Sequence, residues 1–538
     1  MPHPTLLVAL TLALLIAALS VAAQRLRLAS PILMLLAGSA LAFVPNLPPV
    51  HVDPELVLLV LLPPLLYTSG VGMSWRGFRS NLRPILLLSI GCVLFTAAIV
   101  AATVHYALGV SWPVGFVLGA IVSPPDAVAP MAVLRAVHLP RSLVTVLEGE
   151  SLVNDATALV TLGFALAAVG SAPFSLPAAV LQFLVIAVAE IVYGMLVGFV
   201  LLRLRHFVAD ARAEVLLALA TPFIAFWPPH AAGGSGVIAC VATGLYISWN
   251  GRNLIRPATR LQGYFIWDLV VWAVEALVFL LAGLQARAVV SALTTTGWQR
   301  ALLAGILTSV AVIVIRYLWV FPATYLPRWL VPALRRAGPP PDWRHSFLIA
   351  FTGLRGAVSL AAALLIPPFI DGTAFPDRDL LLFATYSVIV VTLVGLGGAL
   401  PRVVRALGLD RRGALEAEGN KQAERRVRLE AIDEVLSAIP KQLPGPEDAA
   451  RSAELQRRHE DRRAFYIRAD ADDSSAPVDD SQALRLLRVE REVVARAYAE
   501  NRLTDEARRR IERELDLEEA RIRHAVESSG HASTTRRS

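Results

Sequence analysis

The residues best suited to chemistry in this sequence are a few ionisable side chains within long apolar segments, and Asp126 is the first of them. A charge inside a membrane helix is costly unless it is paired or hydrated, so it marks a functional site. Asp126 follows Ser123, Pro124 and Pro125 and precedes Pro130. Prolines remove backbone donors and interrupt helices, which predicts free carbonyl oxygens beside a carboxylate. That combination suits a monovalent cation, with Ser123 in support. The alternative is a structural kink whose aspartate is satisfied by a neighbouring helix.

A second polar group has the spacing of a helix. Glu150 and Asn154 are four residues apart, as are Ser151 and Asp155, so one helix carries them on two adjacent stripes. Burial disfavours the charged form of Asp155, so its carboxylate can hold either a proton or a cation, but not both. That exclusion is the chemistry of an exchanger. Asn154 adds no charge and can brace Asp126 or orient its neighbours. Polar bonding between helices is the alternative for both residues of the Asn154-Asp155 pair.

The other buried charges are expected to have partners. Arg316 lies deep in a later apolar segment and is the natural partner of Glu150. We predict a structural ion pair, because a locked pair cannot also bind and release a cation. Arg355 lies in the Gly-Leu-Arg-Gly stretch 353–356, where glycines weaken a helix. It is expected either to neutralise the exposed carbonyl ends of its own helix, broken at this stretch, or to balance Glu148.

These side chains belong to a chain built for a lipid bilayer. Only 17% of its 538 residues are charged and 55% are hydrophobic, whereas soluble proteins carry about 25% charged residues. Up to about residue 403 the sequence is a series of apolar runs, each long enough to cross a hydrocarbon core of about 30 Å as a helix. We predict about thirteen transmembrane helices, near 4–23, 29–47, 55–73, 84–108, 112–136, 142–169, 175–202, 213–229, 235–249, 264–289, 299–321, 345–369 and 379–401.

Arginine placement predicts the orientation of these helices. Arginines gather in alternate loops, for example Arg76 and Arg79 in one and Arg203 and Arg212 in another. Loops rich in Lys and Arg face the cytoplasm. We therefore expect a multi-pass protein of the bacterial inner (plasma) membrane, with the N-terminus outside and the C-terminal tail in the cytoplasm. The first run has no basic residues before it, which favours a retained helix over a cleaved signal peptide.

Two of the predicted helices are interrupted, the fifth by prolines 124–125 and the twelfth by the glycines of 353–356. Interrupted helices at corresponding positions in two halves are typical of inverted-repeat transporters. Because the two breaks are an odd number of helices apart, they run in opposite directions, as two crossed broken helices require. We predict an all-α polytopic membrane protein, with a transmembrane exchange domain over 1–403 and a cytoplasmic helical tail over 404–538.

The amino-acid composition of the tail differs from that of the rest of the chain. Stretches near 415–437, 449–470, 481–500 and 504–527 are rich in Glu, Arg, Ala and Leu, as solvated or paired helices are. The acidic stretch 470–480 is expected to be a linker.

Several other function classes are disfavoured. Cys92 and Cys240 lie in apolar runs and are expected to be buried hydrophobes. The formal charge of +7 comes from arginines between apolar runs, so topology explains it and we expect no nucleic-acid partner. No cofactor is expected. A passive cation channel remains an alternative, because it would use the same carboxylates. A membrane-embedded enzyme is a second alternative, although no histidine cluster lies within the apolar runs.

The sequence resembles the bacterial Na+/H+ antiporters of the monovalent cation:proton antiporter-1 (sodium/proton exchanger) family. The stretch 148–156, Glu-Gly-Glu-Ser-Leu-Val-Asn-Asp-Ala, is similar to the family's sixth-helix signature. The stretches 62–67 and 351–358 resemble its third-helix and twelfth-helix motifs, and Arg316 takes the place of its eleventh-helix arginine. The tail segment 503–519 also resembles the tails of bacterial members.

The resemblance implies a thirteen-helix antiporter fold, a homodimer, and a role in sodium and pH homeostasis. It implies that Na+, or else K+ or Li+, is held by Asp126, Ser151 and Asp155, with Asn154 as a neutral partner and with electroneutral exchange for H+. This chain departs from the family in two places. Tyr67-Thr68-Ser69 stands where some relatives carry an acidic residue in the third helix. Pro125 stands where many relatives carry a threonine, so that hydroxyl ligand is missing here.

Overall fold

The computed structural model describes residues 4–468 and a few isolated positions beyond them. The gaps within that range are 27, 46–53, 135–138, 171–175, 209, 252–256, 292–296, 331, 333–340 and 443–448. The chain divides into two compact units, Met1–Ala417 and Glu418–Ser538. The domain boundary expected at residues 403 and 404, where the last apolar run ends, stays a prediction.

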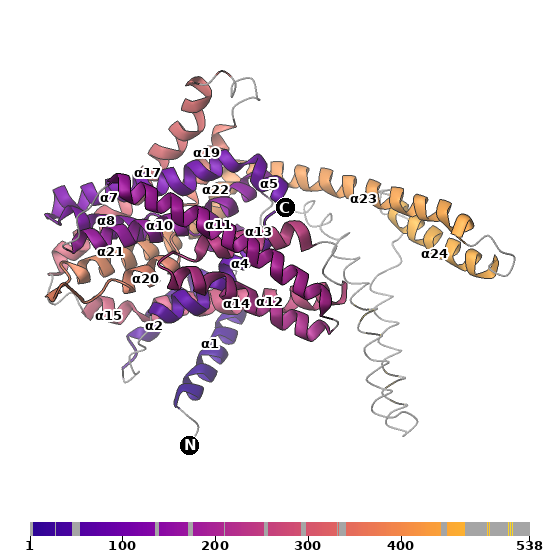
Figure 1. The fold of residues 1–538 in the computed structure, drawn as a ribbon, viewed down its shortest axis with the longest axis horizontal. Helices are drawn as coiled ribbons and strands as arrows, with labels where there is room; N and C mark the ends of the chain where they lie inside the picture. The colour runs from indigo at the N-terminus through magenta and orange to yellow at the C-terminus, as the bar shows by residue number, and fades with distance from the viewer. Residues whose placement is uncertain are drawn as a thin grey trace. The chain divides into compact units, whose positions relative to one another are not determined.

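The first unit is almost entirely helical (Figure 1). Its helices begin with α1 (Pro4–Leu26), α2 (Ser30–Ala42), α3 (Pro54–Leu56), α4 (Leu62–Gly72), α5 (Trp75–Ser80), α6 (Leu82–Leu86), α7 (Val93–Leu108), α8 (Trp112–Val122), α9 (Val128–Leu134), α10 (Arg141–Val169), α11 (Leu176–Phe207), α12 (Ala211–Ala231) and α13 (Val237–Asn250). They continue with α14 (Pro257–Leu284), α15 (Ala286–Ser291), α17 (Trp298–Leu330), α19 (Trp343–Phe351), α20 (Ala357–Leu364), α21 (Arg378–Val390) and α22 (Gly397–Ala406). The π-helical segments η1 (Val57–Leu61), η2 (Leu87–Cys92) and η4 (Val391–Leu396) join helices that flank them.

Many of these helices are apolar enough for a membrane. Within the described part of the chain, seven are also long enough to cross one: Leu82–Leu108, Arg141–Val169, Val180–Arg205, Ala211–Ala231, Gln262–Ser291, Trp298–Leu330 and Arg378–Ala406. Five shorter apolar helices accompany them, at Leu10–Leu26, Ser30–Ala42, Val57–Gly72, Trp112–Val122 and Val237–Asn250. The predicted helical, polytopic class is confirmed, while the total of thirteen spans and the crossing of the broken helices stay predictions.

A small β-hairpin is the departure from an all-α chain among the described residues. Strands β1 (Phe369–Ile370) and β2 (Thr373–Ala374) pair antiparallel. Asp371 and Gly372 connect them with φ values of 48° and 77°. Two consecutive positive φ angles are typical of the tight type I′ turn, which Asp-Gly favours. The predicted twelfth helix therefore ends before this hairpin, because α20 stops at Leu364.

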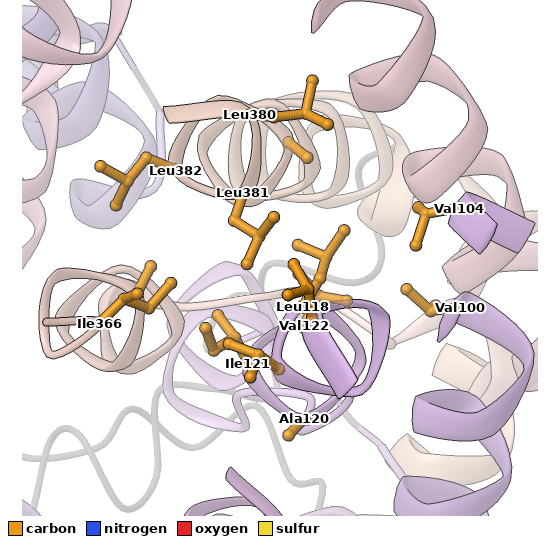
Figure 2. Packing of buried hydrophobic residues seen from close by; sticks show 14 of the residues in the cluster. Val100, Val104, Leu118, Ala120, Ile121, Val122, Ile366, Leu380, Leu381 and Leu382 are labelled. Carbon is orange, nitrogen blue, oxygen red and sulfur yellow. The ribbon is translucent and has the colours of Figure 1, made fainter. Parts of the chain in front are cut away.

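Helices from distant parts of the chain meet in the largest hydrophobic core. Val100 and Val104 of α7, Ile121 of α8 and Leu381 of α21 are at most 1% exposed. Figure 2 shows the side chains of α8 pointing toward those of α21, with α7 and Ile366, just after α20, at the two sides. Helix α8 packs against both α7 and α10. This core holds the C-terminal end of α8 rigidly, just before its break.

Both interruptions predicted from the sequence occur. Helix α8 ends at Val122 and α9 begins at Val128, so the two helices leave a gap at Pro124 and Pro125. Proline at these positions cannot donate the backbone hydrogen bonds that would continue the helix. The second interruption lies between α19, which ends at Phe351, and α20, which begins at Ala357. Its residues include the predicted Gly-Leu-Arg-Gly stretch.

The end of the first unit is tied to the helices around these breaks. Leu409, at the start of α23 (Leu409–Gln442), is fully buried. Arg412 forms a 2.7 Å ion pair with Asp342, the N-cap of α19, and Glu416 accepts a hydrogen bond from the backbone N–H of Arg141 at the start of α10. The backbone N–H of Arg344 and the guanidinium of Arg412 hold the pKa of Asp342 below its usual range, so the pair is lost only in acid. These contacts extend the first unit past the last apolar run.

The second unit contains most of α23 and all of α24 (Ala449–Arg468), close to two of the predicted tail helices. Arg463 of α24 and Asp433 of α23 form an ion pair at 2.6 Å. The predicted helices near 481–500 and 504–527, the linker 470–480 and most of the tail segment 503–519 lie almost wholly outside the described residues.

Candidate ion-binding site

The two interruptions contact each other directly. The backbone N–H of Asp126 donates to the carbonyl of Leu354 at 2.8 Å. Arg355, only 1% exposed, donates from Nε to the carbonyl of Val122 at 2.8 Å and from Nη2 to that of Ser123 at 3.1 Å. Carbonyls at the C-terminal end of a helix have no partner within the helix and carry partial negative charge. The guanidinium therefore satisfies the carbonyl end of α8.

Arg355 is also held by its own interruption and by η4. It donates from Nη1 to the carbonyl of Gly353, and its backbone N–H donates to the Oγ1 of Thr392 in η4 at 3.1 Å. Arg355 was expected to neutralise the carbonyl ends of its own broken helix or to balance Glu148. Two of its side-chain bonds go instead to the carbonyl end of α8 and one goes to Gly353 of its own interruption, and it has no hydrogen bond or ion pair with Glu148 among the described residues. Thr392 was not singled out in the sequence. It lies in a π-helical segment, a feature frequent at functional sites, but nothing local in the sequence marks it.

Asp126 lies at the start of α9. Its Oδ1 accepts a hydrogen bond from the backbone N–H of Val128 at 2.9 Å, so the carboxylate caps this short helix. The other carboxyl oxygen faces Gly356 so closely that a Cβ atom there would overlap the carboxyl group. From the sequence, Gly356 was expected only to weaken a helix. The structure shows that it makes room for Asp126.

Gly356→Ala is therefore expected to displace the Asp126 carboxylate and to raise the apparent KM for the transported cation about tenfold or more, as lost positioning at a site does. The matched control is Gly398→Ala in α22, where a Cβ would meet no atom within 4 Å. Cation-dependent fluorescence dequenching in proteoliposomes gives both KM values. Equal values for the two variants would show that the close approach has no functional consequence.

Helix α10 brings the second polar group to the broken segment. The side-chain amide of Asn154, fully buried, donates to the carbonyl of Pro125. Asp155 is the next residue of α10. It also lines a small cavity together with Pro124. The structure thus brings Asp126, Asn154 and Asp155 together from segments that are 28 residues or more apart in the chain.

The two serines of the predicted site differ in their surroundings. Ser151 is half-buried, one turn before Asp155 on the same face of α10. The hydroxyl of Ser123 donates to the carbonyl of Ala120 at 3.1 Å, within its own helix, while its carbonyl accepts from Arg355. Ser123 therefore acts in this geometry through its backbone.

Glu150 and Arg316 form a bidentate ion pair deep in the protein. Arg316 Nη1 and Nη2 donate to the two carboxylate oxygens at 2.6 and 2.8 Å, and both side chains are 2% exposed. Arg316 Nε also donates to the carbonyl of Ile349 at 3.0 Å. The pair joins α10, α17 and α19. Since two parallel hydrogen bonds hold it, Glu150 has no free oxygen to offer a cation.

The remaining oxygen atoms fit a weakly held monovalent cation. Asp126 and Asp155 supply carboxylates, and the buried Oδ1 of Asn154 has no hydrogen-bond partner among the described residues. A buried acceptor without a partner calls for a ligand or a water. Within the part of the chain that the structure describes, no three His, Cys, Asp or Glu residues lie together as a metal site. The donor set is therefore oxygen alone, which suits hard cations.

Comparison with known proteins identifies the group to which the chain belongs. Residues 10–406 match the family model described as "Sodium/hydrogen exchanger, transmembrane". The chain belongs to the sodium/hydrogen exchanger family. This exchanger is 33% identical to an uncharacterized Na+/H+ exchanger of Mycobacterium tuberculosis, over 94% of this chain and 93% of the relative. It is 29% identical to the Na+/H+ antiporter ApNhaP of Aphanothece halophytica, over 76% of this chain and 75% of the relative.

Two further comparisons concern a relative whose name includes several cations and a solved structure with a similar fold. The exchanger is 32% identical to the sodium, potassium, lithium and rubidium/H+ antiporter of Bacillus subtilis, over 64% of this chain and 53% of that protein. It is similar to a structure of the sodium proton antiporter MjNhaP1 from Methanocaldococcus jannaschii, with a TM-score of 0.62 and 19% identity, over 76% of this chain and 98% of that one. The resemblance stated from the sequence is confirmed: this exchanger is a multi-pass membrane protein of a transporter family.

Proposed function

We propose that this exchanger is a secondary antiporter that exchanges one monovalent cation, Na+ in first place and K+ or Li+ as alternatives, for one H+. The observation that carries the proposal is that Asn154 and Asp155 of α10 meet the broken segment that holds Asp126, which gathers two carboxylates and an uncharged amide there. The names of the relatives support the ions, because they include sodium and hydrogen in every case and potassium and lithium in one.

The charge balance of the site supports electroneutral exchange. Glu150 is neutralised by Arg316, and Arg355 is satisfied by carbonyl oxygens. Asp126 and Asp155 remain to bind cargo. With one cation or with one proton bound, the pair carries the same net charge, so one-for-one exchange moves no net charge across the membrane. The unloaded pair carries one more negative charge, and we expect it not to cross.

The cycle follows alternating access. One bundle carries Asp126, Ser151 and Asp155 past a scaffold, loaded either with the cation or with the proton. We propose a homodimer in the bacterial plasma membrane, with the N-terminus outside and the tail in the cytoplasm. With a proton concentration gradient directed into the cell, this arrangement exports Na+ and imports H+, which would serve pH and sodium homeostasis.

Transport by the purified, reconstituted full-length chain tests this proposal. Proteoliposomes with an acidic interior and a pH-sensitive dye are expected to lose their gradient when Na+ is added, and K+ and Li+ rank selectivity across a pH series. Clamping the membrane potential with valinomycin and K+ is expected to leave the Na+-driven rate unchanged if exchange is electroneutral. A steady current without proton coupling on a planar bilayer would instead identify a channel and overturn the proposal.

A further inference from the structure

The face of α10 that carries Asp155 changes character at that residue. Toward the C-terminal end of α10, Ala158, Leu159 and Leu162 line a small cavity with Asp155. Residues of α8 and α20 complete the cavity, and Ser359 is the polar residue among these additions. Beyond Asp155 and Ser359, such a cavity offers a cation no ligand in exchange for its lost hydration. An ion route on that side of Asp155 is therefore unfavourable in this structure.

Toward the N-terminal end of α10, the same face is polar. Ser151 lies four residues before Asp155 and Glu148 lies seven residues before it, and all three are half-buried, neither sealed in the core nor fully exposed. Seven residues are two helical turns, or about 10 Å along the axis. On this face of α10, a hydroxyl group and a second carboxylate therefore lie only on the N-terminal side of Asp155.

Glu148 has no ion pair or hydrogen bond among the described residues, unlike Glu150 two positions later. The arginine expected as one possible partner, Arg355, donates to carbonyls instead. A half-buried carboxylate without a partner costs free energy in a membrane protein and is a mark of function. Leu152, one turn after Glu148, packs in the cluster that also contains Leu62 of α4 and Val241 of α13. The turn of α10 that follows Glu148 therefore packs against these helices.

We propose that Glu148 is a first binding station for the transported cation, which it takes from solution and passes along Ser151 to Asp155. A fixed negative charge in a cleft raises the local concentration of cations and the rate at which they reach the deeper site. Glu148 is thereby a positioning residue for the cargo and takes no part in holding the proton. This inference rests on the proposed antiport activity.

The test compares Glu148→Gln with wild-type full-length protein in two vesicle preparations, everted and right-side-out, so that Na+ is added to either face. The expected result is an apparent KM for Na+ raised about three- to tenfold on one face only, the face of the α10 N-terminus, with the maximal rate within about twofold of wild type. Raising ionic strength with choline chloride is expected to shrink the difference, because mobile ions screen an accessible charge. Glu148→Asp is expected to recover most of the affinity.

Controls separate this inference from the proposed function. Glu418→Gln removes one negative charge from an exposed tail position and is expected to leave KM unchanged. If wild type exchanges Na+ for H+ and Asp155→Asn does not, the antiport proposal stands. An unchanged KM for Glu148→Gln, a KM raised equally on both faces, or a lost maximal rate at normal KM then overturns the first station alone. If Glu148→Gln does not fold, the KM of Glu148→Asp and its salt dependence decide by the same criteria.

Discussion

Asp155→Asn is expected to reduce cation-dependent proton movement in everted membrane vesicles to the background of empty membranes. The amide has nearly the same shape as the carboxylate, so packing around α10 should persist. It can neither carry the exchanged proton nor neutralise a cation, the two functions that the proposed mechanism gives to Asp155 beside the broken helix. The measurement is acridine-orange dequenching on addition of Na+ or Li+, with protein amount matched by immunoblot.

The Asn154→Ala variant, at the residue next to Asp155, is the informative comparison for Asp155→Asn. It removes the amide that holds the carbonyl of Pro125 but no charge, so we expect weakened cation affinity with exchange retained. Full exchange by Asp155→Asn would show that another group carries the proton, and the assignment of Asp155 would be abandoned.

Glu150→Gln is expected to destabilise the fold rather than to change ion selectivity. Removing one partner of a buried ion pair leaves the other charge uncompensated and costs about 3–5 kcal/mol. Arg316 is 1% exposed and would keep only its bond to the carbonyl of Ile349. The expected readout is a lower melting temperature in detergent and less folded protein on size-exclusion chromatography.

The double variant Glu150→Leu with Arg316→Met is the matched control for this prediction. Replacing both members of a buried pair by apolar residues of similar size is often neutral or stabilising. We therefore expect it to melt at a higher temperature than Glu150→Gln alone. A melting temperature for Glu150→Gln equal to that of wild type would mean that the pair does not stabilise the fold.

The two predictions depend on a division of labour among charges that lie close together on one helix. Glu150 and Asp155 are five residues apart on α10, so they point in different directions around the helix. Glu150 faces α17 and meets Arg316. Asp155 faces the cavity between α8 and α20. The same helix thus carries a charge that is locked and a charge that is left available to cargo.

The sequence by itself determined the class of the protein and the positions of its irregularities. Apolar runs long enough to cross a bilayer must form helices there, because backbone groups cannot be left unpaired in lipid. Pro124 and Pro125 must end a helix, because they lack the backbone donors that would continue it. Charges within such runs stand out by their cost, which is why Asp126 and Asp155 were identified before any contact was known.

Only the tertiary structure decided how these pieces meet. Whether Arg355 satisfies carbonyls or a carboxylate depends on the distance between two breaks that are more than 200 residues apart. The contact of Gly356 with Asp126, the bond from Arg355 to Thr392, and the apolar cavity on one side of Asp155 likewise join distant segments. Local composition sets which residues can bind an ion, whereas packing between remote helices sets which of them are left free to do so.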